Sequence, residues 1–259
     1  MSSRHLAYVG EPVLLQSLLL DPPQSLGTQS WSPRTQLHGV VNADGFGAGW
    51  YPVAGAEPVR YRSGQPLWTD ASFAAVAAST RAGALLASVR SATVGMPVSA
   101  EAAAPFADGR WLFSHNGLVR GWSESMAGPA AALPVTELLR LDAPTDAALL
   151  WALVRQRLRP GVDPGDALAE VVAAVESAAP GSRLNLLLTD GTGIWATAWY
   201  HALSVRTDDD SALVASEPID GHPGWVEVPD RHLVTARPGH CRLTPLRTPT
   251  PPDPTTGDR

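Results

Sequence analysis

Three polar segments each follow an apolar run, and their side chains could bind a charged small molecule. They read N-A-D-G-F-G-A-G-W-Y at residues 42–51, V-R-S-A-T at 89–93 and S-H-N-G-L-V at 114–119. A guanidinium such as that of Arg90 binds a carboxylate through two parallel hydrogen bonds. An Asn amide beside a glycine N–H, as at Asn116 and Gly117, can form an oxyanion hole. The pattern therefore favours a site for an anionic ligand beside an oxyanion hole.

The same residues have ordinary structural interpretations. An Asn-Gly pair such as Asn116-Gly117 is typical of a type I′ turn. Arg90 could form an ion pair on a strand, and Asp146 is favoured in the first turn of a helix by the helix dipole. Composition and spacing alone lead only to a water-soluble α/β domain.

Other familiar motifs are absent from the sequence. It contains no Walker loop, no H-E-x-x-H and no G-x-S-x-G, and no two of its 7 histidines are spaced i, i+4. These absences give little support to a metal site. The glycine run at residues 45–49 precedes W-Y-P rather than a helix, so a dinucleotide loop is not indicated. We expect no cofactor.

Composition limits the compartment and the partners. The 259 residues carry a net charge of -6, and all 19 basic residues are arginines, so we expect no nucleic-acid or membrane partner. A single cysteine, Cys241, excludes an internal disulfide and favours the cytoplasm. We expect Cys241 to pack as a small apolar side chain rather than to act as a nucleophile.

The elements that would position these residues are strands, then two helices, then strands. Thr145 is a suitable N-cap for a helix over residues 146–158, and Asp163-Pro164 opens a second helix that Gly181 ends. Strands are expected at residues 6–9, 83–92, 110–114, 183–189, 194–200 and 212–216, with another pair around Pro238-Gly239. We interpret residues 123–132 as a surface loop. This order predicts an α+β or layered α/β domain with helices on a largely antiparallel sheet.

We predict that residues 1–247 form one domain, and that residues 248–259, which read T-P-T-P-P-D-P-T-T-G-D-R, form a disordered tail.

Taken in order, a set of segments resembles the class II glutamine amidotransferase family of N-terminal-nucleophile hydrolases. The resemblance spans roughly residues 3–246. It is strongest for the members that hydrolyse γ-glutamyl hercynylcysteine sulfoxide in ergothioneine biosynthesis. The segments are S-R-H-L-A-Y at 3–8, L-L-L-D-P-P-Q-S-L at 18–26, Q-S-W-S-P-R at 29–34, H-G-V-V-N-A-D-G-F-G-A-G-W-Y at 38–51, P-L-W-T-D-A-S-F at 66–73, V-R-S-A-T-V-G-M-P at 89–97, F-S-H-N-G at 113–117, A-S-E-P at 215–218 and V-P-D-R-H-L-V at 228–234.

The resemblance implies a role for each matching residue. Arg90 would hold the α-carboxylate of a γ-glutamyl group, and Asp146 would pair with its α-ammonium. Asn116 and the backbone N–H of Gly117 would stabilise the oxyanion. His38 and His115 would line the pocket, which the 42–49 segment would brace.

The resemblance also implies a fold and an activity. The fold is a four-layer αββα sandwich of two mixed, largely antiparallel sheets with outer helices. The activity is hydrolysis of a γ-glutamyl amide on a small-molecule substrate, since little of the chain is left over for a synthase domain. A glutaminase subunit that supplies ammonia to a partner synthase is the alternative enzyme. The leaving amine of the sulfoxide substrate carries a quaternary ammonium, for which Trp31, Trp50, Trp68 and Trp225 are candidate partners.

One departure affects the nucleophile. The family pattern places Cys directly after the initiator Met, whereas this chain has Ser3 at that position and an additional Ser2 before it. A hydroxyl is a weaker nucleophile than a thiol. Removal of Met1 alone would leave Ser2 at the terminus and Ser3 without the free amine that serves as base.

Three interpretations of Ser3 stay open. In the first, Ser3 is an engineered replacement of a nucleophilic Cys, made to trap the substrate. Ser2 or Ser3 can itself act as an N-terminal serine nucleophile. Alternatively, the chain is a paralogue that binds a γ-glutamyl compound without hydrolysing it.

Overall fold

The computed structural model describes residues 3–35 and 41–247. His38 and the predicted tail over residues 248–259 lie outside the described residues. No helix in the described part is long and apolar enough to cross a membrane.

Seven strands form an antiparallel sheet, called sheet A, in the spatial order β11–β9–β10–β1–β4–β2–β3. Strand β1 is central: Arg4 lies opposite Val89 of β4, and Leu6 lies opposite Ala215 of β10. The start of β1 is therefore held from both sides. The strands are β1 (Arg4–Leu14), β2 (Phe46–Trp50), β3 (Val59–Ser63), β4 (Arg81–Val89), β9 (Ser204–Asp208), β10 (Ser211–Ala215) and β11 (Val226–Glu227).

Six strands form sheet B, in the order β13–β12–β8–β7–β6–β5. In both sheets every described strand pair is antiparallel. The expected largely antiparallel character is therefore found, without parallel pairs among the described strands. The strands are β5 (Phe106–Asp108), β6 (Trp111–Leu118), β7 (Arg183–Thr189), β8 (Ile194–Ala198), β12 (His232–Arg237) and β13 (His240–Pro245).

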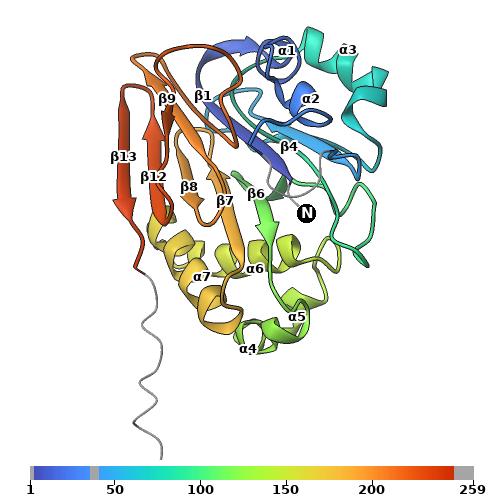
Figure 1. Ribbon diagram of the computed structural model, residues 1–259, viewed down its shortest axis with the longest axis vertical. Coiled ribbons are helices and arrows are strands. Elements are labelled where there is room, and N and C mark those ends of the chain that lie inside the picture. The colour runs from blue at the N-terminus through green and yellow to red at the C-terminus, as the bar shows by residue number, and fades with distance from the viewer. Residues whose placement is uncertain (1–2, 36–40, 248–259) are drawn as a thin grey trace, which may run out of the picture.

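The helices cover the outer faces of the two sheets. Figure 1 shows α1–α3 outside sheet A and α4–α7 outside sheet B. Thr145 caps α6 by accepting a hydrogen bond from the N–H of Ala148 at 3.2 Å, and Asp163 caps α7, whose first residue is Pro164. The helices are α1 (Leu15–Leu19), α2 (Leu26–Gln29), η1 (Leu67–Thr69), α3 (Ala71–Ser79), η2 (Glu124–Met126), α4 (Ala127–Ala131), α5 (Val135–Leu138), α6 (Asp146–Leu158) and α7 (Pro164–Ala178).

Three apolar clusters separate the four layers. Strand β1 shows the alternation that creates them: Leu6 and Tyr8 pack toward α1–α3, while Ala7 and Val9 pack toward sheet B. A third cluster fills the space between sheet B and helices α6 and α7. The predicted four-layer αββα sandwich is therefore confirmed.

Several local predictions are wrong. Ser114 to Leu118 lie within β6, paired with β7, so Asn116-Gly117 is not a turn. The 42–51 segment, for which no strand was predicted, contains β2. Residues 123–132 contain η2 and α4 rather than a plain loop. Cys241 is exposed, not packed, because β13 is the edge strand of sheet B. The secondary structure and exposure of these residues depend on strand partners that are distant in sequence. A local sequence pattern does not reveal those partners.

The cluster between the sheets should dominate stability. Leu86 of β4 is fully buried there. We expect Leu86→Ala to lower the free energy of unfolding by about 3 kcal/mol, because it removes buried apolar atoms and leaves a cavity. Urea denaturation measures the change. Leu139→Ala is the matched control, since Leu139 is 79% exposed. Equal losses in the two variants would contradict this account of the core.

Candidate active site

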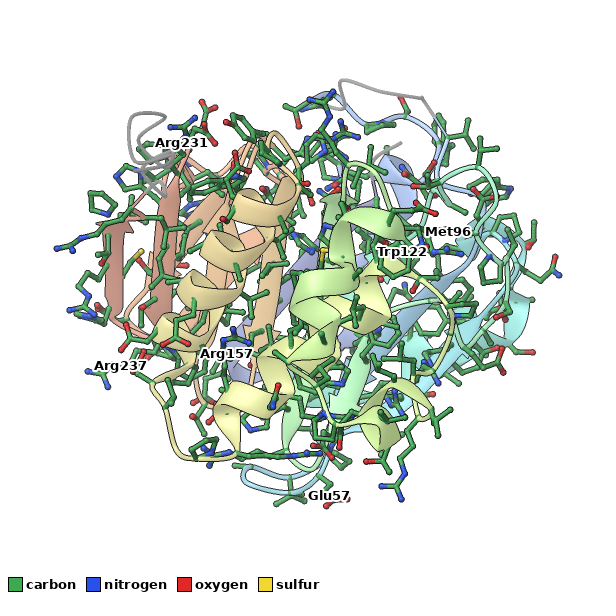
Figure 2. All side chains as sticks on the ribbon, turned by 90° about the horizontal axis from the view of Figure 1, so that it is seen from below. Glu57, Met96, Trp122, Arg157, Arg231 and Arg237 are labelled. Carbon is green, nitrogen blue, oxygen red and sulfur yellow. The ribbon has the colours of Figure 1, made fainter. Side chains whose placement is uncertain are left out.

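A cavity lies at the edge of the sandwich where β1 begins, between the two sheets and the N-terminus of α6. Five of the residues expected from the sequence line it: Ser3, Arg90, His115, Gly117 and Asp146. They come from both sheets and from one helix, so the packing of the layers creates the site. Figure 2 shows α6 and α7 across sheet B, and it shows Met96, another lining residue, well separated from Glu57.

Ser3 directly precedes β1. The register of β1 against β4 places Arg4 opposite Val89, so Ser3 lies beside the residues that follow β4. The N–H of Ser91 points at the Ser3 Oγ from 3.4 Å. Successive side chains of a strand alternate, so Ser3 lies on the same face of sheet A as His5, toward sheet B.

Arg90 follows the last residue of β4 and is buried. Its Nη1 donates to the carbonyl of Pro97 at 2.7 Å, and its own N–H donates to the carbonyl of Gly45 at 2.8 Å. Burial lowers the pKa of the Arg90 guanidinium, and the carboxylates of Asp146 and Asp44 oppose that shift. The guanidinium is thus a fixed cation in the cavity wall.

The 42–49 segment also holds the backbone around Arg90, through Asp44. The N–H of Asp44 donates to the Arg90 carbonyl at 3.0 Å, and the Asp44 carboxylate accepts a hydrogen bond from the N–H of Ala92 at 2.8 Å. Asp44 therefore ties the loop before β2 to the segment after β4. The sequence pattern placed this segment near the pocket but did not single out Asp44.

Asp146 is the first residue of α6 and is buried. Its two carboxylate oxygens accept hydrogen bonds from the N–H groups of Val119 at 3.1 Å and Ala147 at 2.8 Å. The positive end of the helix dipole also stabilises the anion. Asp146 and Arg90 thus place one negative and one positive charge in the same cavity wall, which matches the ammonium and carboxylate of an α-amino acid.

Asn116 and Gly117 lie near the end of β6. Asn116 is fully buried, and its Nδ2 donates to the Oγ of Ser216 at 3.2 Å, so it borders the cavity without lining it. A Cβ at position 117 would collide with the carbonyl oxygen of Arg183 and lie 2.6 Å from the Nε2 of His115. Gly117 is therefore required by the close approach of β6 and β7.

His115 lines the cavity, and its ring is held by the neighbouring strand β7. Its Nε2 lies 3.0 Å from the carbonyl oxygen of Arg183. A carbonyl only accepts, so the Nε2–H of His115 is the donor of this hydrogen bond.

His5 is fully buried between the sheets beside this site. Its Nδ1 lies 3.1 Å from the Oγ of Ser114, and its N–H donates to Ser216. Burial, assisted by the nearby His115, Arg4 and His201, lowers the pKa of His5 to about 3. The ring is therefore neutral at physiological pH.

A buried ion pair lies on the opposite face of β1, and the sequence pattern did not predict it. The guanidinium of Arg4 lies 3.9 Å from the carboxylate of Glu217, and both side chains are buried. Glu217 also accepts hydrogen bonds from the N–H groups of Arg34 and Thr35 and from Gln24. Although burial raises the pKa of Glu217, these hydrogen bonds and the charge of Arg4 hold it below its usual value. Glu217 lies in the A-S-E-P segment at residues 215–218, which was the one sequence signal for this ion pair.

Several known proteins are similar to this chain. A family model described as "Glutamine amidotransferases class-II" matches residues 21–207. A Mycolicibacterium smegmatis protein named gamma-glutamyl-hercynylcysteine sulfoxide hydrolase is 47% identical over 244 residues, covering 94% of this chain and 99% of that protein. A Mycobacterium tuberculosis protein of the same name is 44% identical over 243 residues, covering 94% of this chain and 96% of that protein.

Solved structures share the fold. A glutamine aminotransferase class-II domain protein from Silicibacter pomeroyi superposes with a TM-score of 0.68 at 26% identity, covering 94% of this chain and 99% of that one. The glutamine phosphoribosylpyrophosphate amidotransferase of B. subtilis gives a TM-score of 0.66 at 14% identity, covering 94% of this chain and 49% of that one.

The buried His5 predicts a dependence of stability on pH. Its pKa falls from 6.5 to about 3 on folding. Between these values the unfolded chain binds a proton that the folded chain does not, so acid favours unfolding. We expect the free energy of unfolding to fall by up to about 1.4 kcal/mol per pH unit below pH 6.5 through this group, as measured by urea denaturation.

Two variants isolate this contribution. His5→Gln should show a flatter dependence on pH, whereas His240→Gln, at an exposed position, should keep the parent slope. If the free energy of unfolding depends on pH equally in His5→Gln and in the parent, groups other than His5 cause the dependence.

Proposed function

The chain belongs to the class-II glutamine amidotransferase family, and we propose that it hydrolyses a γ-glutamyl amide to glutamate and a free amine. The observation that carries the proposal is the pair of opposite charges in the cavity wall, Arg90 and Asp146. A γ-glutamyl group presents an α-carboxylate and an α-ammonium on one carbon. Both can be bound at once by this pair.

Arg90 binds the α-carboxylate and Asp146 binds the α-ammonium in this proposal. The remaining chain of the glutamyl group then extends toward Ser3, Asn116 and Gly117, with its γ-carbonyl at the reacting position. His115 and the bracing segment around Asp44 keep the wall in place. His38 is carried over from the family pattern as a further pocket residue.

The chemistry requires a nucleophile and a base at the first residue. The Ser3 Oγ attacks the γ-carbonyl carbon while its proton passes to the α-amine of the same residue. The Asn116 amide and the Gly117 N–H stabilise the oxyanion. The C–N bond breaks, the leaving amine takes the proton, and water then hydrolyses the γ-glutamyl ester to glutamate. While Ser2 precedes Ser3, the Ser3 nitrogen is an amide and cannot act as the base.

The names of the two mycobacterial relatives support a specific substrate. Both are named for hydrolysis of γ-glutamyl hercynylcysteine sulfoxide, and each alignment covers 94% of this chain. We propose this compound as the substrate, within ergothioneine biosynthesis.

A second function is favoured by one feature, the Ser2-Ser3 sequence in place of a terminal Cys. Because Arg90 and Asp146 do not depend on the nucleophile, the chain could bind γ-glutamyl compounds without hydrolysing them. A hydrolase and a protein that only binds would have the same affinity for a γ-glutamyl compound. Only the hydrolase would release glutamate from it.

Arg90 provides the first test. Arg90→Ala removes the cation opposite the substrate carboxylate, so we expect the affinity for glutamine to fall at least about 30-fold. Isothermal titration calorimetry measures it. Arg110→Ala removes a guanidinium that is 59% exposed and should leave the affinity unchanged. Unchanged affinity in Arg90→Ala would rule out the carboxylate assignment.

The terminus provides the second test, through glutamate release from γ-glutamyl hercynylcysteine sulfoxide and from glutamine. Three versions are compared: the chain as written, a version lacking Ser2, and a version lacking Ser2 with Ser3→Cys. We expect the Cys version to be fastest. The chain as written should be at least about 100-fold slower than the version lacking Ser2, because its Ser3 has no amine base.

Mass spectrometry of the intact proteins verifies which residue is first after Met removal. Equal rates in the chain as written and in the Cys version would contradict catalysis at this position. Ligand binding without glutamate release by all three versions would favour the binding function.

A further inference from the structure

A surface cavity of about 400 Å³ lies on sheet B, at the end opposite the candidate active site. Gly117, which lines the active-site cavity, lies opposite Leu184 at one end of β7. The turn after Thr189, at the other end of β7, leads into the second cavity. The described lining of this cavity includes Trp195, Thr235, Arg237, His240 and Arg242. No function proposed above uses these side chains.

The register of the last three strands of sheet B brings these side chains together. Trp195 of β8 lies opposite Thr235 of β12, and Thr235 lies opposite Arg242 of β13. Arg237 and His240 form the next such pair, nearer the turn between β12 and β13. Alternate side chains of a strand share a face, so all five project from one face of the sheet.

This face is the outer face of sheet B, which α7 covers only in part. The residues on the opposite face, Val234 and Ala236, belong to the cluster between the sheets. Helix α7 begins beside Leu233, since a Cβ at Gly165 would lie 2.8 Å from the Leu233 side chain. The helix therefore leaves open the part of the face nearer the β12–β13 turn, where Arg237 lies at the periphery of the molecule (Figure 2).

The aromatic wall of the cavity is held in place. The Trp195 side chain is half-buried, and its ring centre lies 5.9 Å from that of Trp111. Gly193 contributes no side chain, and a Cβ there would lie 3.1 Å from the Trp195 ring. The missing side chain at Gly193 leaves room beside the indole, which is thus a fixed surface on which a planar ring can stack.

The rest of the wall is cationic. Arg237 and Arg242 are exposed, and neither forms an ion pair within residues 3–35 and 41–247. His240 adds a ring N–H that can donate a hydrogen bond. No acidic residue is among the described lining residues, although the whole chain carries a net charge of -6. The cavity therefore favours an anion.

Carboxylates near the cavity hold other partners. Asp190 accepts a hydrogen bond from the N–H of Gly193 at 3.1 Å and pairs with Arg110 at 3.4 Å. Asp163 caps α7 by accepting the N–H of Gly165 at 2.8 Å. Neither carboxylate lines the cavity. The arginines of the wall therefore keep their charge for a ligand.

We propose that this cavity binds a phosphate ester of a planar aromatic group, such as a nucleoside monophosphate. Arg237 and Arg242 bind the phosphate, and the ring stacks on Trp195. The guanidinium fork matches two oxygens of a phosphate. A phosphate monoester carries a charge of about −1.5 to −2 near pH 7, which two arginines balance. A cavity of this size is ordinary for a small-molecule site. Because it lies at the opposite end of sheet B, the proposal does not depend on the proposed function.

Calorimetric titration of the full chain with adenosine monophosphate, inorganic phosphate and adenosine tests the proposal. We expect the monophosphate to bind most tightly, because it alone reaches both the arginines and the indole. Joint replacement by Arg237→Gln and Arg242→Gln should weaken its binding at least about fivefold, since each exposed contact contributes about two- to fivefold. Trp195→Leu should weaken it at least about fivefold and leave the affinity for inorganic phosphate unchanged. Trp195→Phe should retain most of the affinity.

Arg140→Gln is the matched control, since Arg140 is another exposed arginine and follows α5, which lies apart from β12 and β13 (Figure 1). It should change none of these affinities. If the double arginine variant binds the monophosphate as tightly as the parent does, the ligand binds elsewhere and the inference is wrong. A parent that binds none of the three probes also overturns it.

The stacking role has its own outcome. Equal affinities of the parent for the monophosphate and for inorganic phosphate, with no loss in Trp195→Leu, would contradict an aromatic ester as the ligand. If Trp195→Leu does not fold, Trp195→Phe and the exposed arginines still decide the question. The proposed function is tested separately by glutamine binding and glutamate release, so either proposal can fail without the other.

Discussion

The central position of β1 in sheet A is the constraint on which the site depends. Hydrogen bonds to β4 and β10 hold the strand from both sides at its first residues. The buried pair of Arg4 and Glu217 adds a third restraint, since Glu217 also holds the N–H groups of Arg34 and Thr35. Ser3, which directly precedes the strand, therefore lies within hydrogen-bond distance of the N–H of Ser91.

The alternation of side chains along β1 separates structural from chemical functions. Arg4 and Leu6 face the helices of sheet A, where Arg4 is anchored by Glu217. Ser3 and His5 face sheet B, where the cavity and the polar contacts of Ser216 lie. A buried charge is costly unless it is paired, so the Arg4–Glu217 pair is better explained as a positioning device than as a source of stability.

The sequence predicted the parts of the fold that follow from local signals. The caps Thr145 and Asp163 fix the starts of α6 and α7, and both helices begin where the sequence predicts. The family resemblance also assigned Arg90 and Asp146 to one site, and both line the same cavity. The sequence did not reveal that Asn116 lies inside a strand or that Ser216 contacts it, because Asn116 pairs with Asn185 of β7 and Ser216 lies 100 residues further along the chain. Such contacts are set by the register of the sheets, which no local pattern encodes.

The proposed function assigns recognition and catalysis to different parts of this fold. The charges that fit an α-amino acid lie after β4 and at the start of α6, and both are fixed by backbone hydrogen bonds that do not involve β1. The proposed nucleophile, in contrast, is the single residue Ser3, which directly precedes β1. A hydroxyl in place of a thiol at that position is expected to slow the proposed reaction, and it removes neither charge. Under the proposed function, a substitution at Ser3 therefore separates binding from turnover.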